Sequence, residues 1–217
     1  MSGSPTYRAL VVTASNRAAA GVYADKGGPL LVEGLAALGL AVDGPRVVPD
    51  GDPVEAALRD AVAASYDVVV TTGGTGISPT DRTPEATRRV LDYEVPGIAE
   101  AVRAEGLAKV PTAALSRGLA GVAGPTLIVN LPGSTGGVRD GLAVLGRLLV
   151  HAVEQLRGGD HPRPADSPDP AGPAHPADTS RSTDTGGPTD TDGPADTGRP
   201  TDPTGPTAPT GPAGSAR

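Results

Sequence analysis

The residues of this chain best suited to chemistry are a glycine-rich loop and an aspartate that follow a run of valines. The loop reads Gly73-Gly74-Thr75-Gly76 and comes soon after the apolar residues 68–70. A strand that runs into glycines exposes backbone N–H groups, which can bind anions such as phosphates. Asp81 follows the loop, and a carboxylate there can hold a divalent cation beside a bound phosphate. The pattern predicts a site for phosphates and a metal ion.

The glycine loop matches neither of the two common nucleotide-binding fingerprints. No Gly-Lys-Ser/Thr follows it, and Pro79 stands where the dinucleotide fingerprint needs its third glycine. The alternative interpretation is a tight turn whose glycines adopt positive φ. Asp81 can likewise be read as the cap of a turn, although Thr83 already suits the start of the following helix. The residues alone leave a ligand site and a simple turn both open.

Two other segments, each expected to follow a strand, carry further candidates. Asp50 follows the predicted strand 40–48, and Pro132-Gly133-Ser134 leads from the predicted strand 126–131 into the last helix. Backbone N–H groups and a hydroxyl at a helix N-terminus are favourable for an anion. Ligands of parallel sheets bind beyond the carboxyl ends of the strands. We therefore expect these segments and the glycine loop to meet at one rim.

Residue usage limits the kinds of catalysis that the chain can perform. It has no cysteine, two of its three histidines lie in the segment 158–217, and His151 is expected on the polar side of a helix. A Ser-His-Asp or Cys-His mechanism is therefore not expected. Arg82 and Arg117 are candidate phosphate contacts, with solvated surface residues as the alternative. Enzymatic work would rest on carboxylates, a metal, hydroxyls, arginines and backbone amides.

Strands and helices are predicted to alternate along the chain. Asp52 and Thr83 are the expected N-caps of two helices. Residues 15–28 are predicted to form a loop, and residues 112–120 are ambiguous. The predicted strands are 8–14, 40–48, 67–72 and 126–131, and the predicted helices are 29–39, 52–65, 83–92, 96–107 and a last one that ends near residue 156. This alternation predicts an α/β domain whose mostly parallel sheet is covered on both faces.

Residues 158–217 differ in composition from the rest of the chain. They contain 13 Pro and 10 Gly, and no Leu, Ile, Val, Met or aromatic residue. Such a segment has no apolar surface to offset the entropy of ordering it. We therefore predict a folded domain over residues 5–157 and a disordered Pro/Gly/Thr/Asp-rich tail over residues 158–217.

The net charge of −7 divides between these two parts. The tail holds nine Asp and four Arg, a charge of −5, which leaves −7 − (−5) = −2 for the rest. A mildly acidic domain with only two lysines is not expected to bind nucleic acid. The apolar runs are too short to span a bilayer, and the N-terminus lacks a signal-peptide pattern. We expect a cytoplasmic protein with no membrane partner.

Four motifs follow one another along the chain. They are Pro49-Asp50, the glycine loop with Asp81 in residues 72–86, Leu115-Ser116-Arg117, and Asn130-Leu131-Pro132-Gly133-Ser134. In this order they resemble the MoaB/Mog family of molybdenum cofactor biosynthesis, over residues 7–156. The resemblance implies a three-layer αβα sandwich that binds molybdopterin. In catalytic members it implies a molybdopterin adenylyltransferase that uses Mg²⁺ and ATP, usually a homotrimer with a hexamer as the alternative, and a molybdate-inserting enzyme downstream.

Carried over position by position, the resemblance gives Asp50 and Asp81 catalytic and metal-binding roles. It assigns the pterin- and nucleotide-binding walls to Thr72, Gly73, Gly74, Thr75, Gly76, Ser116, Pro132, Gly133 and Ser134. The proposed chemistry suits these residue types. A phosphate nucleophile is already anionic at neutral pH, so the protein has to position two polyanions and neutralise their charge.

The chain departs from the family pattern at three positions near these motifs. Asn16 stands where the family often has Asp, Arg82 where it often has an apolar residue, and Thr135 where a Pro is common. We expect the loss of the carboxylate at position 16 to weaken a polar contact. Both aspartates and the glycine loop are retained.

Two alternatives to an adenylyltransferase stay open. One is a non-catalytic member of the family that binds molybdopterin or a nucleotide, against which the retention of Asp50 and Asp81 counts. The other is the related domain of competence-damage-type proteins, which act on nicotinamide nucleotides; the lack of a second enzymatic domain is expected to exclude it. The tail is expected to be a spacer, with an interaction arm as the alternative.

We expect a chain that ends at residue 157 to unfold at nearly the same temperature as the full-length chain. The deleted segment has no Leu, Ile, Val, Met or aromatic side chain with which to pack on the domain. Differential scanning calorimetry of the two proteins measures both midpoints. A midpoint many degrees lower in the shortened chain would show that the tail packs.

Overall fold

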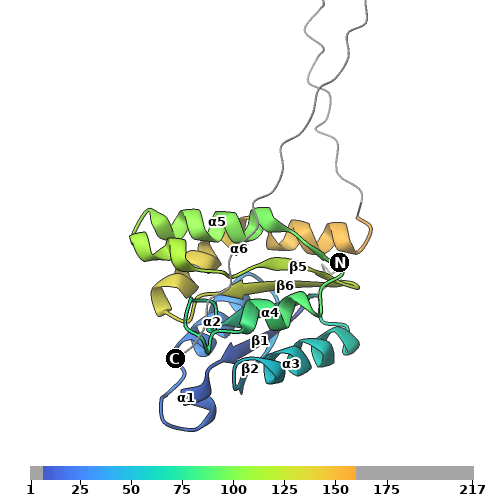
Figure 1. Ribbon diagram of the computed structural model, residues 1–217. Helices are drawn as coiled ribbons and strands as arrows, with labels where there is room; N and C mark the ends of the chain where they lie inside the picture. Colours follow the sequence, from blue (N-terminus) through green and yellow to red (C-terminus); the bar gives the residue numbers. More distant parts are fainter. Residues whose placement is uncertain (1–6, 160–217) are drawn as a thin grey trace, which may run out of the picture. The chain divides into compact units, whose positions relative to one another are not determined.

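A single six-stranded sheet forms the centre of the fold (Figure 1). The computed structural model describes residues 7–159. The strands are β1 (Arg8–Ala14), β2 (Ala41–Val48), β3 (Val68–Thr72), β4 (Tyr93–Glu94), β5 (Ala120–Ala123) and β6 (Thr126–Leu131). Across the sheet they lie in the order β2-β1-β3-β6-β5-β4. The first, second, third and sixth strands are those that the alternation predicted.

Four neighbouring strands are parallel, so their carboxyl ends lie at one rim of the sheet. β1 pairs in parallel with β2 and β3, and β3 pairs in parallel with β6. Every residue of β3 and β6 is buried, as expected of parallel strands that are covered on both faces. The loops that leave this rim begin after Ala14, Val48, Thr72 and Leu131. The fold thus brings distant segments of the chain to one edge.

β4 and β5 extend the sheet beyond β6, and the sequence pattern did not predict them. β5 pairs antiparallel with β6 across a tight turn at Gly124, whose φ is 54°, and β4 pairs antiparallel with β5. Strands of two and four residues are too short to show an alternation of apolar and polar residues. The ambiguous segment 112–120 forms most of a 3₁₀ turn, η1 (Pro111–Leu115), and then leads into β5.

Helices cover both faces of the sheet. They are α1 (Asn16–Ala19), α2 (Gly27–Ala37), α3 (Asp52–Ala63), α4 (Thr83–Arg88), α5 (Pro96–Leu107) and α6 (Thr135–Leu156). α2, α5 and α6 pack into one apolar core with the sheet, and α3 and α4 pack into a second core on its other face (Figure 1). This arrangement confirms the predicted three-layer αβα sandwich with a mostly parallel sheet.

The segment between β1 and α2 is more ordered than the predicted loop over residues 15–28. Its first part is the single turn α1, where the Ser15 hydroxyl accepts a hydrogen bond from the N–H of Ala18 at 3.2 Å. Further on, Asp25 Oδ1 accepts from the N–H groups of Gly27 and Gly28, both at 3.0 Å. Because this carboxylate satisfies two N–H groups of the first turn, α2 begins two residues before the predicted start.

Both predicted N-caps are wrong by one residue. Gly51 and Arg82 hold the cap positions of α3 and α4, and neither makes a side-chain cap hydrogen bond. Asp52 and Thr83 are the first residues inside these helices. The Thr83 hydroxyl donates instead to Asp50 Oδ1 at 2.8 Å. A contact between two rim loops has replaced the local cap.

The last helix is tied to the sheet close to the predicted end of the domain. Arg157 Nε donates to Asp67 Oδ1 at 2.8 Å, and its guanidinium lies 4.8 Å from the centre of the Tyr7 ring. The domain start predicted at residue 5 and nearly all of the predicted tail lie outside the described residues, so both stay predictions. Within residues 7–159, no helix combines the length and apolar character needed to cross a bilayer.

Candidate functional site

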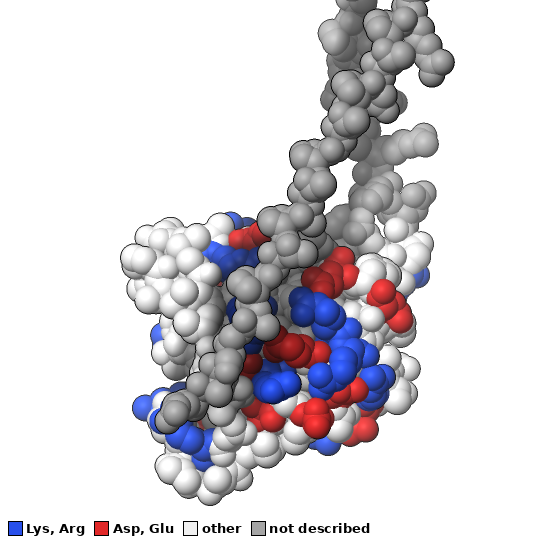
Figure 2. Space-filling view, in the orientation of Figure 1, with Lys and Arg blue, Asp and Glu red and all other residues white. Residues whose placement is uncertain are grey.

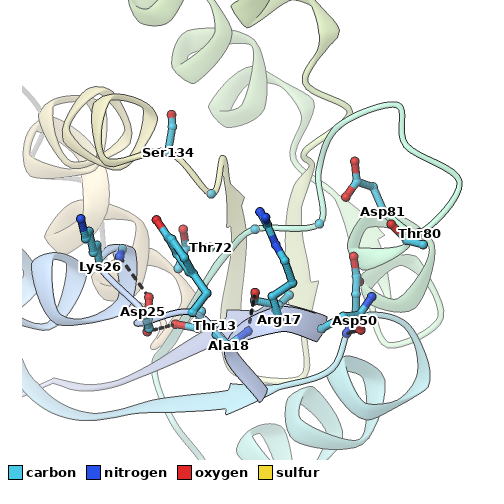
Figure 3. A pocket seen from close by; sticks show the side chains of 18 of the residues that line it. Thr13, Arg17, Ala18, Asp25, Lys26, Asp50, Thr72, Thr80, Asp81 and Ser134 are labelled. Atoms are coloured by element: carbon cyan, nitrogen blue, oxygen red, sulfur yellow. Dashed lines mark hydrogen bonds between the residues drawn. The ribbon is translucent and has the colours of Figure 1, made fainter. Parts of the chain in front are cut away.

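Four loops at the rim of the sheet line a pocket of about 920 Å³, here named the polar pocket (Figure 3). They follow β1, β2, β3 and β6, and the start of α2 completes the wall. Of the predicted site residues, those that line it are Asp50, Thr72, Gly73, Gly74, Asp81, Gly133 and Ser134. The structure therefore brings together the three segments that the strand order was expected to join.

A second pocket, of about 620 Å³, shares part of this wall and is here named the apolar pocket. Thr75, Gly76, Ser116 and Pro132 line it, together with apolar side chains from α5 and η1. The predicted residues that line both pockets are Gly73, Gly74, Asp81, Gly133 and Ser134. Every predicted site residue thus lines at least one pocket, while the binding roles themselves stay predictions.

The wall between the pockets is built from glycines that a side chain would disrupt. Gly73 and Gly74 have φ of 97° and 62°, a conformation that strongly favours glycine. A Cβ on Gly73 would lie 2.3 Å from the Ala14 carbonyl oxygen, and one on Gly74 would lie 2.1 Å from Asp50 Oδ2. A Cβ on Gly133 would lie 3.1 Å from the Gly73 Cα. The tight turn with positive φ is therefore confirmed, and the same residues form the pocket wall, where ligand binding stays a prediction.

Thr72 and Ser134 attach this wall to the ends of β3 and α6. The Thr72 hydroxyl donates to the Pro132 carbonyl at 2.8 Å, which joins the ends of two neighbouring strands. Ser134 is the N-cap of α6, and its hydroxyl accepts from the N–H of Gly137 at 3.1 Å. The N-terminus of a 22-residue helix therefore borders the pockets, where its dipole favours an anion.

Both carboxylate oxygens of Asp50 accept hydrogen bonds from other residues of the protein. Oδ1 accepts from the N–H of Gly51 at 2.7 Å and from the Thr83 hydroxyl at 2.8 Å, and Oδ2 accepts from the N–H of Arg82 at 3.1 Å. The side chain lies against Gly74, where no Cβ intervenes. Asp50 therefore joins the loop after β2 to the start of α4 and to the glycine loop. This structural role accounts for an aspartate in the Pro49-Asp50 motif even if it contacts no ligand.

Asp81 is more available than Asp50, although it is not free of the turn. Its Oδ2 accepts from the N–H of Ser78 at 3.1 Å, and its own N–H donates to the Ser78 carbonyl at 2.9 Å. The turn interpretation is therefore correct for one oxygen. Within residues 7–159, no donor contacts Oδ1, and the residue lines both pockets. One carboxylate oxygen is left for a ligand.

The departure at Asn16 does not remove a polar contact at the rim. Asn16 Oδ1 accepts a hydrogen bond from the N–H of Asp50 at 3.0 Å. An amide oxygen accepts such a bond as a carboxylate does, so the link between the loops after β1 and β2 is kept. The polar contact that was expected to weaken is therefore present. Asn16 makes it without placing a second negative charge next to Asp50.

Two cationic side chains of the polar pocket were not among the predicted site residues. Arg17 and Lys26 line it, and Figure 3 shows Lys26 and the pair Asp50 and Asp81 toward opposite sides of the view, with Arg17 between them. The Arg17 guanidinium lies 5.5 Å from the centre of the Tyr23 ring. Within the described part of the chain, no carboxylate pairs with either cation. Their position in the loop after the first parallel strand was the signal that could have found them.

Arg82 and Arg117, the predicted phosphate contacts, line neither pocket. Arg82 contributes its backbone N–H to Asp50, as described above. The Arg117 guanidinium is occupied by the protein: Nε donates to the Gly76 carbonyl at 2.7 Å, and Nη1 pairs with Glu85. The prediction that these two side chains bind phosphate is not supported by the geometry.

An ion pair between a buried carboxylate and an exposed lysine lies in the wall of the apolar pocket. Asp140 is only 7% exposed, and the Lys109 ammonium donates to its carboxylate. The hydrogen bond that the ammonium donates to Asp140, and after it the one that it donates to Glu105, raise the pKa of Lys109 above its usual value. The pair neutralises a carboxylate that would otherwise repel an anion in this pocket.

Charges of both signs alternate over the face formed by α3 and α4 (Figure 2). Glu55 accepts from Arg89 and from Arg59, and these hydrogen bonds, the one from Arg89 first, lower its pKa. Glu85 lies near the start of α4. Burial acts to raise its pKa, but the hydrogen bond from Arg117 and further favourable contacts outweigh burial, so the pKa is lowered. This face is a network of ion pairs and holds no patch of one sign.

Within residues 7–159, no three His, Cys, Asp or Glu side chains are grouped closely enough to form a metal site on their own. Mg²⁺ is commonly held by one or two carboxylates, with waters and substrate phosphates as its other ligands. Asp81, with one carboxylate oxygen open toward the two pockets, fits this kind of Mg²⁺ coordination. The carboxylate of Asp50 fits it less well, because both of its oxygens already accept hydrogen bonds.

Residues 10–152 match the family model described as "Probable molybdopterin binding domain". The chain belongs to the MoaB/Mog family of molybdopterin-binding proteins. A solved structure of MogA is 60% identical with a TM-score of 0.68, covering 69% of this chain and 99% of that one. These matches confirm the family that the four motifs indicated.

Two curated relatives belong to molybdenum cofactor biosynthesis. The molybdopterin adenylyltransferase of Escherichia coli K12 is 39% identical over 159 residues, which is 68% of this chain and 80% of that protein. A molybdenum cofactor biosynthesis bifunctional protein of Chlorobaculum tepidum is 36% identical over 156 residues, or 71% of this chain. The MoaB/Mog chain spans about half the length of that bifunctional relative.

Gly73→Ala is expected to destabilise the MoaB/Mog domain more than Gly39→Ala. Both glycines have φ near +90°, at 97° and 90°, so a left-handed alanine costs about 1–2 kcal/mol at either position. Only at Gly73 does the new Cβ overlap a backbone atom, which adds about 1–3 kcal/mol. Urea unfolding of both variants measures the difference. Equal losses would contradict a close approach of the two backbones.

The Arg117–Glu85 pair should make the stability of the MoaB/Mog domain depend on acidification. The folded-state pKa of Glu85 lies below its usual value of 4.5. The pair therefore stabilises the fold above pH 4.5, and this contribution is lost as the pH falls through the lowered folded-state pKa. Urea unfolding between about pH 6 and pH 3 should show a smaller acid loss for Glu85→Gln than for the wild type. Parallel curves for the two proteins would exclude this contribution.

Proposed function

We propose that this protein is a molybdopterin adenylyltransferase, which joins molybdopterin and ATP to give adenylyl-molybdopterin and pyrophosphate. The observation that carries the proposal is the pair of adjoining pockets, which share the glycine wall and Asp81. Two large anionic substrates that react with each other need two neighbouring sites with a common boundary. The similarity to proteins named molybdopterin adenylyltransferase supports the same activity.

The reaction needs positioning and charge neutralisation more than it needs an acid or a base. A phosphate oxygen of molybdopterin attacks the α-phosphorus of ATP, a new P–O bond forms, and the bond to the β-phosphate oxygen breaks to release pyrophosphate. The nucleophile is already anionic at neutral pH, so no proton has to be removed. This explains why a site that contains no histidine and no cysteine can perform the step.

Each part of the wall has a role in holding the two anions. Lys26 and Arg17 supply positive charge in the polar pocket, and the N-terminus of α6 at Ser134 supplies oriented N–H groups. The apolar side chains Val110 and Leu115 of the second pocket suit the flat face of a ring system. Preorganised groups of this kind neutralise charge without moving during the reaction.

The two aspartates are proposed to divide their roles. Asp81 is proposed to hold Mg²⁺, whose charge would neutralise the phosphates when it is bound. Asp50 is proposed to orient the site, since its carboxylate already accepts three hydrogen bonds from Gly51, Arg82 and Thr83. The resemblance left this division undecided, and the hydrogen bonds of Asp50 favour it.

The remaining family properties are proposals of the same kind. We propose a cytoplasmic homotrimer, with a hexamer as the alternative assembly, whose product passes to a molybdate-inserting enzyme. No step of the reaction above depends on the assembly, because all residues assigned to it lie in one chain.

Asp81→Asn is expected to abolish product formation, with a loss of at least about 100-fold in kcat, while the domain stays folded. The substitution removes the charge that a metal ion requires, and it keeps an oxygen that can accept from Ser78. The assay incubates each protein with molybdopterin, Mg²⁺ and ATP and measures adenylyl-molybdopterin. The thermal midpoint of the Asp81→Asn variant should change little. Full activity in this variant would exclude Asp81 as a metal ligand.

Two further variants complete this test. Asp60→Asn removes one carboxylate from the exposed side of α3, where it pairs with Arg46, and should leave activity unchanged. Asp50→Asn should lower both activity and stability, because one of its oxygens becomes an N–H₂ group that faces existing donors. If the wild-type protein binds molybdopterin and forms no product, it is a non-catalytic member of the family.

A further inference from the structure

Arg117 lies outside both pockets, yet it contacts the loop that carries Asp81 at four points. Its backbone N–H donates to the Thr75 carbonyl at 2.7 Å. In its guanidinium, Nε donates to the Gly76 carbonyl at 2.7 Å, and Nη2 donates to the Asp81 carbonyl at 2.6 Å. Nη1 pairs with the Glu85 carboxylate. One side chain thus spans the loop from its first residue to the helix that follows it.

The bonds from Nε to Gly76 and from Nη2 to Asp81 are the only hydrogen bonds that join residues 76–81 to another segment of the described chain. We name residues 76–81 the Asp81 loop. Within residues 7–159, its other hydrogen bonds are local, namely those among Ser78, Thr80 and Asp81. Residues 77–80 are exposed, and Ile77 is 68% exposed, so packing does not hold them. A loop with few buried contacts samples other conformations unless hydrogen bonds restrain it.

Glu85 fixes the direction of the Arg117 guanidinium. Its Oε1 pairs with Arg117, and its Oε2 is buried without a hydrogen-bond partner among the described residues. Loss of the arginine would leave a partly buried carboxylate without its counter-charge, which is unfavourable. The glutamate and the two carbonyls together match the planar donor pattern of a guanidinium, and a lysine ammonium cannot reach all three.

We propose that Arg117 is a positioning residue that holds Asp81 in place by joining both ends of the Asp81 loop. The role of Asp81 in the reaction rests on the proposed function, whereas the restraint of the loop does not. Arg117 then acts on catalysis without touching substrate. Small displacements of a reacting or metal-binding group can lower the rate about 100-fold, so a restraint of this kind has a measurable effect.

The first experiment tests the restraint without any assay of activity. Amide hydrogen exchange is measured for the wild type, Arg117→Ala and Arg88→Ala. We expect Arg117→Ala to speed exchange in residues 76–81 by about tenfold or more, with the central strands unchanged. Arg88→Ala removes a cation from the same face, where it pairs with Glu94, and should leave the loop unchanged. Unchanged exchange of the loop in Arg117→Ala overturns the proposal.

The second experiment separates positioning from substrate binding. In steady-state assays with molybdopterin, Mg²⁺ and ATP, Arg117→Ala should lower kcat about 10- to 100-fold with little change in the KM for ATP. Arg117→Lys should recover only part of kcat, because one ammonium cannot donate to both carbonyls and to Glu85. A raised KM with an unchanged kcat would mean that Arg117 binds phosphate, which overturns the proposal.

Failure of the proposed function gives a different result. A wild-type protein that makes no adenylyl-molybdopterin refutes the activity, and hydrogen exchange still decides whether Arg117 restrains the loop. A wild-type protein that is active, beside an equally active Arg117→Ala, refutes only the positioning role. A lower thermal midpoint with normal kcat below it would make Arg117 merely structural, and this also overturns the proposal.

Discussion

The close approach of backbones at Gly73, Gly74 and Gly133 is the constraint on which the rest of the site depends. The end of β3 touches the end of β1 at Ala14 and the turn after β6 at Gly133, and at each point a Cβ would lie about 3 Å or less from a neighbouring atom. Because only backbone separates the polar and apolar pockets there, ligands in the two pockets can meet. A side chain at Gly73 or Gly133 would force neighbouring backbone apart, and one at Gly74 would displace the Asp50 carboxylate.

The fold and the location of the site could be predicted from the sequence because both follow from short-range patterns. Alternation of strands and helices predicts a parallel sheet, and a parallel sheet gathers its loops at one rim. The strands β4 and β5 were missed because pairing with β6, and not their own sequence, makes them strands. The start of α4 could not be predicted to the residue because Thr83 donates to Asp50, a partner 33 residues away, instead of capping its own helix.

The different hydrogen-bond partners of Asp50 and Asp81 could not be predicted either, because such partners depend on contacts between residues that are distant in the sequence. Both follow or flank glycines, and both lie at the rim, so their patterns look alike in the sequence. The difference lies in the partners of the two carboxylates. The Asp50 carboxylate accepts from Arg82 and Thr83 across the rim, whereas, among residues 7–159, the Asp81 carboxylate accepts only from Ser78 in its own turn. The sequence leaves Arg117 open between a phosphate contact and a solvated surface residue, because a lone arginine gives no sign of which carbonyls it will meet in the fold.

The charge balance of the domain explains why the site relies on local groups. A folded part with a net charge of −2 cannot attract polyanions through a broad positive field. The polar pocket holds Arg17 and Lys26 against Asp25, Asp50 and Asp81. The hydroxyl and N–H partners of Asp25 and Asp50 offset much of their charge. In the proposed reaction a phosphate would meet Arg17 and Lys26, which pair with no carboxylate among residues 7–159. It would also meet N–H groups of the glycine loop and α6, and the Asp81 oxygen that no described donor contacts. In the proposed reaction these few groups neutralise two substrates, so the position of each one matters, and the loop that carries Asp81 is largely exposed.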